Sequence, residues 1–349
     1  MIYTDCYNKM LISIIIPVYN VEQYIIRCLQ SVVAQKDLDK IEVIIVDDCG
    51  TDNSIALAKE FLVGCSGLDY KILHHAKNGG LSAARNTGLR AAKGDYVYFL
   101  DSDDEITANC IRQLVAPLKD GEYDFVIGDY TTTLGDGASM LQLQAGELTG
   151  NDAVLEAYAK GLWYVMAWNK LCKREFLLKN NLFFEEGVLH EDVVWSFKLA
   201  CKATSMYVVK EPVYIYSIRE ASIMTGMSID KDMAVYTAAF DAVARFIKED
   251  GRQCGAWEYR IFQGKRAGIL YSLLQKGETA LYSKYYPRFY AHCCFSPWKM
   301  YRNGHITLGY LLRDVHYMLP VGLGRAYMRL FYMIFYKLRG KKIEGAVWN

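Results

Sequence analysis

GDYVYFLDSDD (residues 94–104) joins a short apolar run, 96–100, to three aspartates within the next four positions. A run of this length, rich in aromatic residues, predicts a strand buried on both faces of a sheet. Asp101 and Asp103 stand at positions i and i+2 after it, so they are expected on one side. Two carboxylates held that closely favour a cation beside them, and their hard oxygens suit Mg²⁺ or Mn²⁺. The alternative is a solvated acidic turn, since such turns are common.

The residues before this stretch alternate between strand and helix patterns. Buried strands are predicted at 11–16, 41–46 and 70–73, and helices at 21–34, 54–63 and 81–92, with Asp52 or Asn53 capping the second helix. This alternation predicts an α/β fold with a doubly wound, mostly parallel sheet and helices on both faces. In such sheets ligands bind at the carboxyl ends of the strands.

The pattern loosens after residue 104. A strand is expected at 125–127, a hairpin or loop at 131–146, short helices at 152–159 and 175–179, an amphipathic helix at 191–201, and two strands at 207–209 and 213–216. From residue 230 the pattern is mainly helical. We therefore expect two domains, 1–228 and 229–349.

Polar residues at the other predicted strand ends support a ligand site. Asp48 follows the second strand, where a carboxylate could accept a hydrogen bond from a nucleobase or ribose. Asn78, before two glycines, and Arg85, on the next helix, could contact a ligand or the acidic cluster. Neither GxxxxGK[ST] nor GxGxxG is present, which argues against a Walker-type or dinucleotide-binding loop.

Composition narrows the possible classes. The 349 residues carry 40 basic and 39 acidic side chains, a net charge of +1, which argues against a nucleic-acid-binding protein. A hydrophobic content of 52% excludes a chain kept disordered by charge. The ten cysteines include no CxxC pair and are interpreted as reduced thiols of a cytoplasmic protein. No secretory leader or membrane-spanning run is predicted.

Four motifs in order resemble glycosyltransferase family 2, whose members have the GT-A fold. They are SIIIPVYN (13–20), VDDCGTDNS (46–54), NGGLSAARNTGL (78–89) and GDYVYFLDSDD (94–104). WNKLCKREF (168–176), HED (190–192) and YSIREASIM (216–224) extend the resemblance to about residue 225. The family's usual glycine after the two aspartates is Cys49 here, which puts the geometry of that turn in question.

The resemblance implies a role for each matching residue. Donor-binding roles fall to a set spread over the motifs: Pro17 and Tyr19 beside the nucleobase, Asp48 on uracil, Asn78 and Arg85 on the nucleotide-sugar, Asp101 and Ser102 on the ribose or sugar side, and Arg219 and Ser222 on the diphosphate. Asp103, with Asp101, would bind Mn²⁺ or Mg²⁺. Asp192 would be the catalytic base and Glu191 its helper. Without the resemblance, these two acids could simply form an acidic helix N-terminus.

Aromatic residues and the carboxyl-terminal tail suggest further contacts. Trp163, Tyr164 and Trp168 could stack on an acceptor sugar or pack in the core. Residues 321–349 carry six basic side chains and one acid, interleaved with apolar residues. This pattern is typical of a helix in an anionic membrane interface, although a helix packed on the body with a basic outer face also fits.

The resemblance and the motifs together lead to one principal hypothesis. It is an inverting, metal-dependent glycosyltransferase of the hexosyl- or N-acetylhexosaminyl class, moving a sugar from a nucleotide-sugar, expected to be a UDP-sugar. The expected acceptor is a hydroxyl of a glycan or lipid-linked saccharide in bacterial surface polysaccharide or capsule synthesis, at the inner face of the plasma membrane. A sugar-1-phosphate nucleotidyltransferase or a non-catalytic nucleotide-sugar-binding subunit remains as an alternative.

Overall fold

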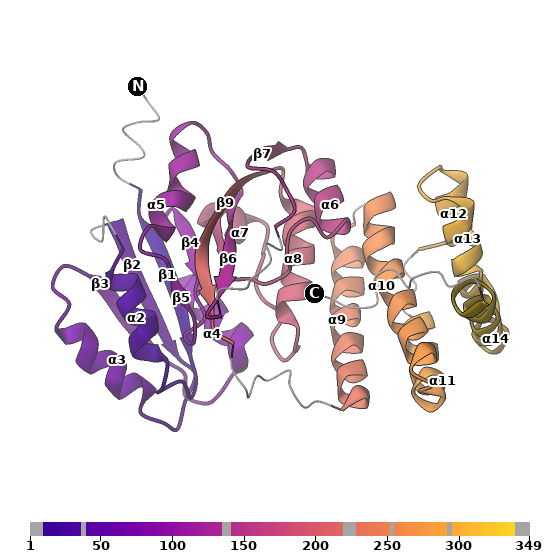
Figure 1. Cartoon of the computed structure of the whole chain (residues 1–349), viewed down its shortest axis with the longest axis horizontal. Helices are drawn as coiled ribbons and strands as arrows, with labels where there is room; N and C mark the ends of the chain where they lie inside the picture. The colour runs from indigo at the N-terminus through magenta and orange to yellow at the C-terminus, as the bar shows by residue number, and fades with distance from the viewer. Residues whose placement is uncertain are drawn as a thin grey trace. The chain divides into compact units, whose positions relative to one another are not determined.

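The computed structural model describes residues 10–35, 40–134, 141–218, 228–251, 255–291 and 295–338. The chain divides into two compact units, Met1–Thr225 and Gly226–Asn349. The first holds the sheet, and the described part of the second is helical (Figure 1).

The amino-terminal half of the first unit has the predicted alternation. Its elements are β1 (Ile12–Val18), α2 (Ile25–Val33), β2 (Ile41–Asp47), α3 (Ser54–Val63), β3 (Asp69–His74), α4 (Gly80–Ala91) and β4 (Tyr96–Phe99). The strands lie in the order β3-β2-β1-β4, and every neighbouring pair is parallel. Helix α4 packs on β1 and β2, and α2 packs on α3 (Figure 1). The doubly wound parallel sheet is therefore confirmed in this half.

Strand β1 ends two residues later than predicted, because it continues through Pro17 to Val18. Proline cannot donate a ladder hydrogen bond, so it needs an unpaired side. Pairing of β1 with β4 stops at Ile15, while pairing with β2 continues to Val18. Pro17 therefore has a partner strand on one side only, so the missing N–H does not end the strand.

The second half of this unit is mixed in direction. It contains β5 (Glu105–Ile106), α5 (Cys110–Val115), a 3₁₀ turn (Ala116–Lys119), β6 (Phe125–Thr132), β7 (Gly146–Thr149), α6 (Asn151–Ala159), β8 (Lys170–Lys173), α7 (Arg174–Lys179), α8 (Glu191–Lys202) and β9 (Ser205–Tyr216). Over the described residues these strands complete one nine-stranded sheet in the order β3-β2-β1-β4-β8-β6-β9-β5, with β7 also on β9. Strand β8 is antiparallel to both β4 and β6, whereas β6 and β9 are parallel.

The two strands predicted at 207–209 and 213–216 are one strand, β9. Lys210, Glu211 and Pro212 interrupt its apolar pattern, which made the sequence look like two pieces. The sheet absorbs this interruption as register shifts opposite Asp129. A bulge of this kind bends and twists a strand without ending it.

The second unit consists of helices over its described residues. They are α9 (Ile229–Glu249), α10 (Ala256–Gln275), α11 (Thr279–Ala291), α12 (Pro297–Arg302), α13 (Leu308–Asp314), a 3₁₀ turn (Val315–Met318), α14 (Val321–Tyr332) and a π-helical segment (Met333–Leu338). Helix α11 packs on α9, α10 and α14. None of the described helices has the length and apolar character needed to cross a membrane.

Helix α14 carries two apolar stripes. Gly324, Met328 and Phe331, at i, i+4 and i+7, are buried. Leu323 and Leu330, on another face, are 62% and 54% exposed. Arg325 and Arg329 lie between the stripes on the remaining side of the helix, by the 100° step of an α-helix. The predicted basic, apolar helix thus exists to Leu338, while residues 339–349 of the tail lie outside the described residues.

Candidate active site

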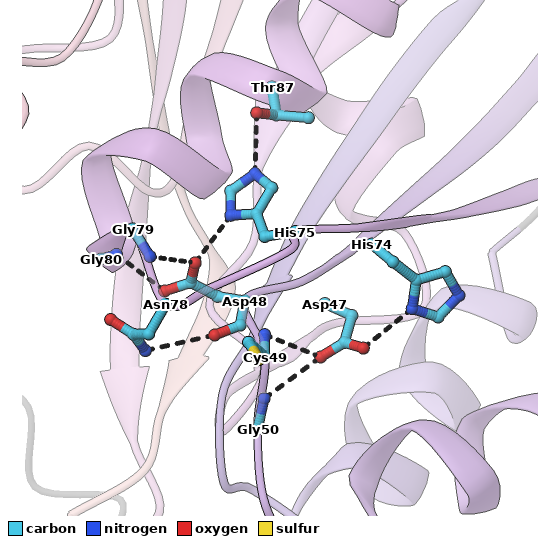
Figure 2. A network of polar contacts seen from close by, with 10 residues as sticks. All are labelled: Asp47, Asp48, Cys49, Gly50, His74, His75, Asn78, Gly79, Gly80 and Thr87. Atoms are coloured by element: carbon cyan, nitrogen blue, oxygen red, sulfur yellow. Dashed lines mark hydrogen bonds and ion pairs between the residues drawn. The ribbon is translucent and has the colours of Figure 1, made fainter.

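Asp48, at the end of β2, fastens the turn before α4 (Figure 2). Its Oδ1 accepts a hydrogen bond from Gly79 N at 2.8 Å, and its Oδ2 accepts one from Gly80 N at 2.8 Å. His75 Nδ1 lies 2.7 Å from Oδ1, and its Nε2 lies 2.9 Å from Thr87 Oγ1. A carboxylate facing the first N–H groups of a helix is the arrangement that the helix dipole favours.

The same network leaves little room for side chains. A Cβ on Gly79 would stand 2.9 Å from the Cβ of Ala83, and Gly80 has φ +84°, a region that favours glycine. Asn78 Nδ2 donates to Asp48 O at 3.2 Å, so Asn78 and Asp48 are adjacent as the motif order suggested. His75 was missed by the sequence analysis, although it follows directly from the end of β3, where the same strand-end rule applies.

Cys49 occupies the strained turn after β2. Its φ is +63°, and Asp47 Oδ1 accepts hydrogen bonds from Cys49 N and Gly50 N at 3.1 and 3.3 Å (Figure 2). His74 Nδ1 lies 2.8 Å from the other oxygen of Asp47. The turn is therefore held by Asp47 even though a cysteine stands where glycine would be relaxed. At the next helix, Asn53 occupies the N-cap position without a side-chain cap hydrogen bond, and the Asp52 carboxylate before it accepts from Ser54 N at 3.0 Å.

Arg85 joins the acidic cluster after β4 to the HED motif. Its Nη2 donates to Asp101 Oδ1 at 2.7 Å, and its Nη1 donates to Glu191 Oε1 at 2.7 Å. The guanidinium is 2% exposed and lies over the ring of Phe184, 5.2 Å from its centroid. Burial alone would lower the pKa of Arg85, but Asp101 and Glu191 raise it above its ordinary value. Residues 106 positions apart thereby meet at one site.

Asp103 and Asp104, the next members of the cluster, face different surroundings. Asp103 is half-buried. Asp104 is buried, accepts from Tyr214 Oη at 2.6 Å and from Ser217 N at 2.7 Å, and so ties the end of β9 to β4. Burial, with the nearby charge of Asp101, raises the pKa of Asp104 to about 7. Its engagement by two donors makes Asp104 structural, a role the sequence analysis did not assign.

Helix α8 begins at the base candidates. His190 precedes it with φ +61°, and Asp192 Oδ1 accepts from Val193 N at 2.8 Å. Burial raises the pKa of the Asp192 carboxyl to about 7, and the negative charge of Glu191 acts in the same direction. Arg85 and Lys170 oppose this shift. Asp192 is therefore a better proton acceptor than an ordinary aspartate, because its conjugate acid is weaker.

Lys170 is a buried cation near this carboxylate. It lies in β8, is fully buried, and donates to Met166 O while facing the ring of Tyr164 at 4.5 Å. Burial lowers the pKa of its ammonium group to about 7. Lys170 could not be assigned a role from the sequence, because nothing in the local sequence shows that α8 lies close by.

Helix α4 also fixes the segment that leads to α8. Asn86 Nδ2 donates to Phe184 O at 2.9 Å, Asn86 Oδ1 accepts from Phe184 N at 2.8 Å, and Ser82 Oγ donates to Glu185 O at 2.8 Å. The NGGLSAARN motif therefore supports both sides of the site: its glycines cradle Asp48, and its later residues position the chain before the HED motif.

The carboxylate oxygens that follow β4 fit a divalent cation whose remaining ligands come from the substrate. Over the described residues, no group of three or more His, Cys, Asp or Glu side chains is arranged to hold a metal ion. Asp101 and Asp103 offer two carboxylates, and one oxygen of Asp101 is engaged by Arg85. Mg²⁺ and Mn²⁺ commonly take one or two carboxylates and complete their coordination with phosphate oxygens and water.

The remaining predicted residues have these locations. Pro17 is the second-last residue of β1, and Tyr19, which directly follows the strand, is 49% exposed. Ser102 is buried between Asp101 and Asp103. Arg219 and Ser222 lie outside the described residues. Trp163, Tyr164 and Trp168 are 2%, 2% and 4% exposed, so all three pack in the core and cannot offer a face to a sugar.

Comparison with known proteins identifies the family. The family model described as "Glycosyl transferase family 2" matches residues 13–179. The chain is 33% identical over 250 residues to the putative glycosyltransferase EpsH of Bacillus subtilis (strain 168), an alignment that covers 69% of this chain and 70% of that protein. The chain belongs to glycosyltransferase family 2. It is therefore a glycosyltransferase.

Solved structures agree with this glycosyltransferase assignment at the level of the fold. A fragment of S. aureus TarS in complex with UDP-GlcNAc is similar with a TM-score of 0.68 and 19% identity, covering 96% of this chain and 95% of that one. The mannosyltransferase PcManGT from Pyrobaculum calidifontis, in complex with GDP-Man and Mn²⁺, has a TM-score of 0.52 and 16% identity, covering 95% of this chain and 88% of that one. The predicted GT-A fold with a helical carboxyl-terminal region is confirmed.

Proposed function

We propose that this glycosyltransferase transfers a hexosyl or N-acetylhexosaminyl group from a UDP-sugar to a hydroxyl of a glycan or lipid-linked saccharide, with inversion at the anomeric carbon. The observation that carries the proposal is the Arg85 bridge, which places the acidic motif beside the helix that bears Asp192. A single displacement with inversion requires the base to face the anomeric carbon from the side opposite the leaving diphosphate, so the base and the diphosphate-binding groups must lie close together at one site.

Each residue has a part in this displacement. The acceptor oxygen forms a bond to the anomeric carbon as the bond from that carbon to the diphosphate oxygen breaks, and UDP leaves with the electron pair. Asp192 takes the acceptor proton. Glu191, paired with Arg85, orients the start of α8 and holds Arg85 beside Asp101. Asp103 and Asp101 would hold Mg²⁺ or Mn²⁺, which would neutralise charge on the leaving diphosphate.

The solved structures with a similar fold support the preference for a UDP-sugar as donor. TarS was solved with UDP-GlcNAc and resembles the chain more closely than PcManGT, which was solved with GDP-Man. Exposed Tyr19 and the Asp48 network stand at adjacent strand ends, where a nucleotide would lie. The family type also supports the proposal of a role, in the cytoplasm, in assembling bacterial surface polysaccharide or capsule.

A membrane contact is part of the proposal. Residues 279–349 contain 11 basic and two acidic residues. One of the two, Asp314, is buried and paired with Arg313. Together with the outward apolar stripe of α14, this excess favours an anionic lipid surface such as the inner face of a plasma membrane.

The test is a donor screen followed by product analysis. UDP-glucose, UDP-galactose, UDP-GlcNAc and GDP-mannose are added with Mg²⁺ or Mn²⁺, and the donor that binds raises the melting temperature. Release of UDP from that donor supports the proposal. Release of GDP from GDP-mannose, with no release of UDP from any UDP-sugar, would contradict the UDP-sugar assignment.

Variants then test the site. We expect Asp192→Asn to lower kcat by roughly 10²–10⁴-fold, the usual contribution of a positioned general base. Asp103→Ala should remove the dependence of activity on added metal together with most of the activity. Asp69→Asn, which changes an exposed carboxylate at the opposite end of β3, is the control and should leave activity unchanged.

A further inference from the structure

Five aromatic rings pack together where β6 and β9 end. The Trp168 ring lies parallel to Tyr214, with centroids 4.3 Å apart and planes at 9°, and nearly parallel to Tyr216 at 5.9 Å and 19°. Tyr130 meets Trp168 edge-on, at 5.0 Å and 83°. Tyr164 completes the group at 5.4 Å from Trp168. Trp168, Tyr164 and Tyr214 are buried, whereas Tyr216 is 36% exposed and Tyr130 is half-buried.

The two accessible tyrosines are held in place from several sides. In the parallel pairing of β6 and β9, Tyr130 lies opposite Tyr214 and Thr132 lies opposite Tyr216. Thr133 N donates to Tyr216 O at 3.0 Å, which secures the backbone of Tyr216. On the other side, Asp104 accepts from Tyr214 Oη and from Ser217 N, the residues flanking position 216. A ring supported in this way loses little further conformational freedom when a ligand stacks on it.

These tyrosines also stand on the side of the acidic motif away from the Asp48 network. The strand order is β3-β2-β1-β4-β8-β6-β9, so β4, which leads into the acidic motif, separates β2 from β9. Burial and then the charges of Asp104 and Asp101 raise the pKa of Tyr216, which places its ring within electrostatic reach of the motif. A nucleotide at the ends of β1 and β2 would have its diphosphate at the acidic motif, and Arg219 and Ser222, which the resemblance assigns to the diphosphate, follow Tyr216 by three and six positions. Tyr216 would therefore lie beside the reacting end of the donor, where the second reactant must meet it.

We propose that the exposed Tyr216 ring, which lies nearly parallel to Trp168 and is bordered by half-buried Tyr130, binds a pyranose ring of the acceptor. This inference rests on the proposed function, because it assigns the second reactant of the same transfer. One face of a pyranose presents C–H groups, which are attracted to the negative face of an aromatic ring. Tyr216 is thus a specificity residue that sets which sugar the acceptor may present, while Asp192 performs the proton transfer.

The experiment is saturation-transfer NMR on the full chain loaded with UDP and Mg²⁺. The probes are the methyl β-glycosides of glucose, galactose, mannose and N-acetylglucosamine. We expect saturation at the ring C–H protons of at least one glycoside. Tyr216→Leu should weaken binding of that glycoside by about tenfold, the effect of losing a good aromatic contact. Tyr216→Phe, which keeps the ring, should bind like the unaltered protein.

The same samples separate the two proposals. UDP binding is measured by titration in each variant and should be equal in the unaltered protein, Tyr216→Leu and Tyr216→Phe. If UDP fails to bind the unaltered protein, the proposed function fails. If UDP binds equally but no glycoside binds, or Tyr216→Leu binds it as well as the unaltered protein, only the acceptor assignment is overturned. A Tyr216→Leu protein that also loses UDP binding would assign Tyr216 to the donor, which overturns the inference as well.

Discussion

Asp192, the proposed base, shows how neighbouring groups shift the pKa of a single residue. It stands in the first turn of α8, where the helix dipole favours a charged carboxylate, yet burial and Glu191 raise its pKa to about 7. Arg85 and Lys170, both buried cations, limit that rise. The balance places the pKa near neutral pH, where a general base is both ionised and basic enough to act.

This balance predicts a pH dependence. Asp192 must be ionised to accept a proton, so kcat/KM should increase about tenfold per pH unit below pH 7 and level off above it. Glu191→Gln removes the negative charge that raises the pKa of Asp192, and it also leaves Arg85 with one carboxylate fewer. The acidic limb should therefore move to lower pH, as measured from initial rates of UDP release. A limb that stays in place would assign the titration to another group, such as Asp104.

Cys49 predicts a change in stability at a single position. A non-glycine residue at φ +63° costs about 1–2 kcal/mol, of which glycine recovers part after its own entropy cost of about 0.5–1 kcal/mol. Cys49→Gly should therefore stabilise the protein by up to about 1 kcal/mol in urea unfolding. Cys49→Ala removes the thiol but keeps the strain, so it is the matched control and should show no such gain.

At the scale of elements, helix α4 is held against β1 by the absence of a side chain. A Cβ on Gly88 would stand 2.3 Å from Ile15 Cγ2, well inside van der Waals contact. Ile15 is fully buried in β1, so it cannot move aside cheaply. The close approach of α4 is what brings Arg85 and Asn86 to the sheet edge.

Gly88→Ala tests this contact, and two effects of opposite sign compete. In a helix interior alanine is favoured over glycine by about 1 kcal/mol, but overpacking a core costs about 1–3 kcal/mol. We expect net destabilisation in urea unfolding. Gly64→Ala, whose Cβ would meet nothing nearer than 3.5 Å, should be neutral or stabilising. Combining Gly88→Ala with Ile15→Ala should cost less than the sum of the two single changes.

The elements that could be predicted from sequence are those with a local signature. The strands and helices up to residue 99 have long apolar runs or clear periodicity, and all were found within a few residues. Strand β8 was missed because its four residues begin and end with lysine, and β9 was divided because Pro212 interrupts it. Whether these segments form strands depends on their pairing with β4 and β6, which are distant in the sequence. A local pattern carries no information on such pairing.

The candidate site also divides into residues that the local sequence reveals and partners that it does not. The strand-end rule located Asp48, Asp101 and Asp103, and the resemblance added Asp192. The partners could not be predicted, because Arg85 meets Glu191 across 106 positions and Tyr214 meets Asp104 across 110. The aromatic residues chosen from sequence, Trp163 and Trp168 among them, are buried, since burial depends on elements that pack over them.

At the scale of the whole molecule, charge is distributed unevenly along a nearly neutral chain. The net charge is +1, while residues 279–349 carry 11 basic and two acidic residues. Exposed Leu323, Leu330 and Met333 belong to the same segment. We therefore expect the protein to sediment with vesicles that contain phosphatidylglycerol but not with neutral phosphatidylcholine vesicles, and to be released by high salt.

Substitution should show which part of the molecule makes this contact. Leu323→Asp combined with Leu330→Asp places charge on the outward stripe of α14 and should abolish sedimentation with anionic vesicles. Val63→Asp changes a residue of the first unit that is 82% exposed, and it should have no effect. Equal binding by the α14 variant and the unaltered protein would show that the stripe does not contact lipid.

The order of the strands bears on how such enzymes diversify. The parallel half of the sheet is one continuous piece of chain, residues 12–99, whereas β8, β6 and β9 all come from residues after 124. A single genetic crossover near the end of β4 would therefore exchange the whole parallel half of the sheet, with the Asp48 network and Arg85, while the acidic motif and α8 stay in place. Chimaeras joined at this point would show whether Arg85 from another family member still pairs with both Asp101 and Glu191.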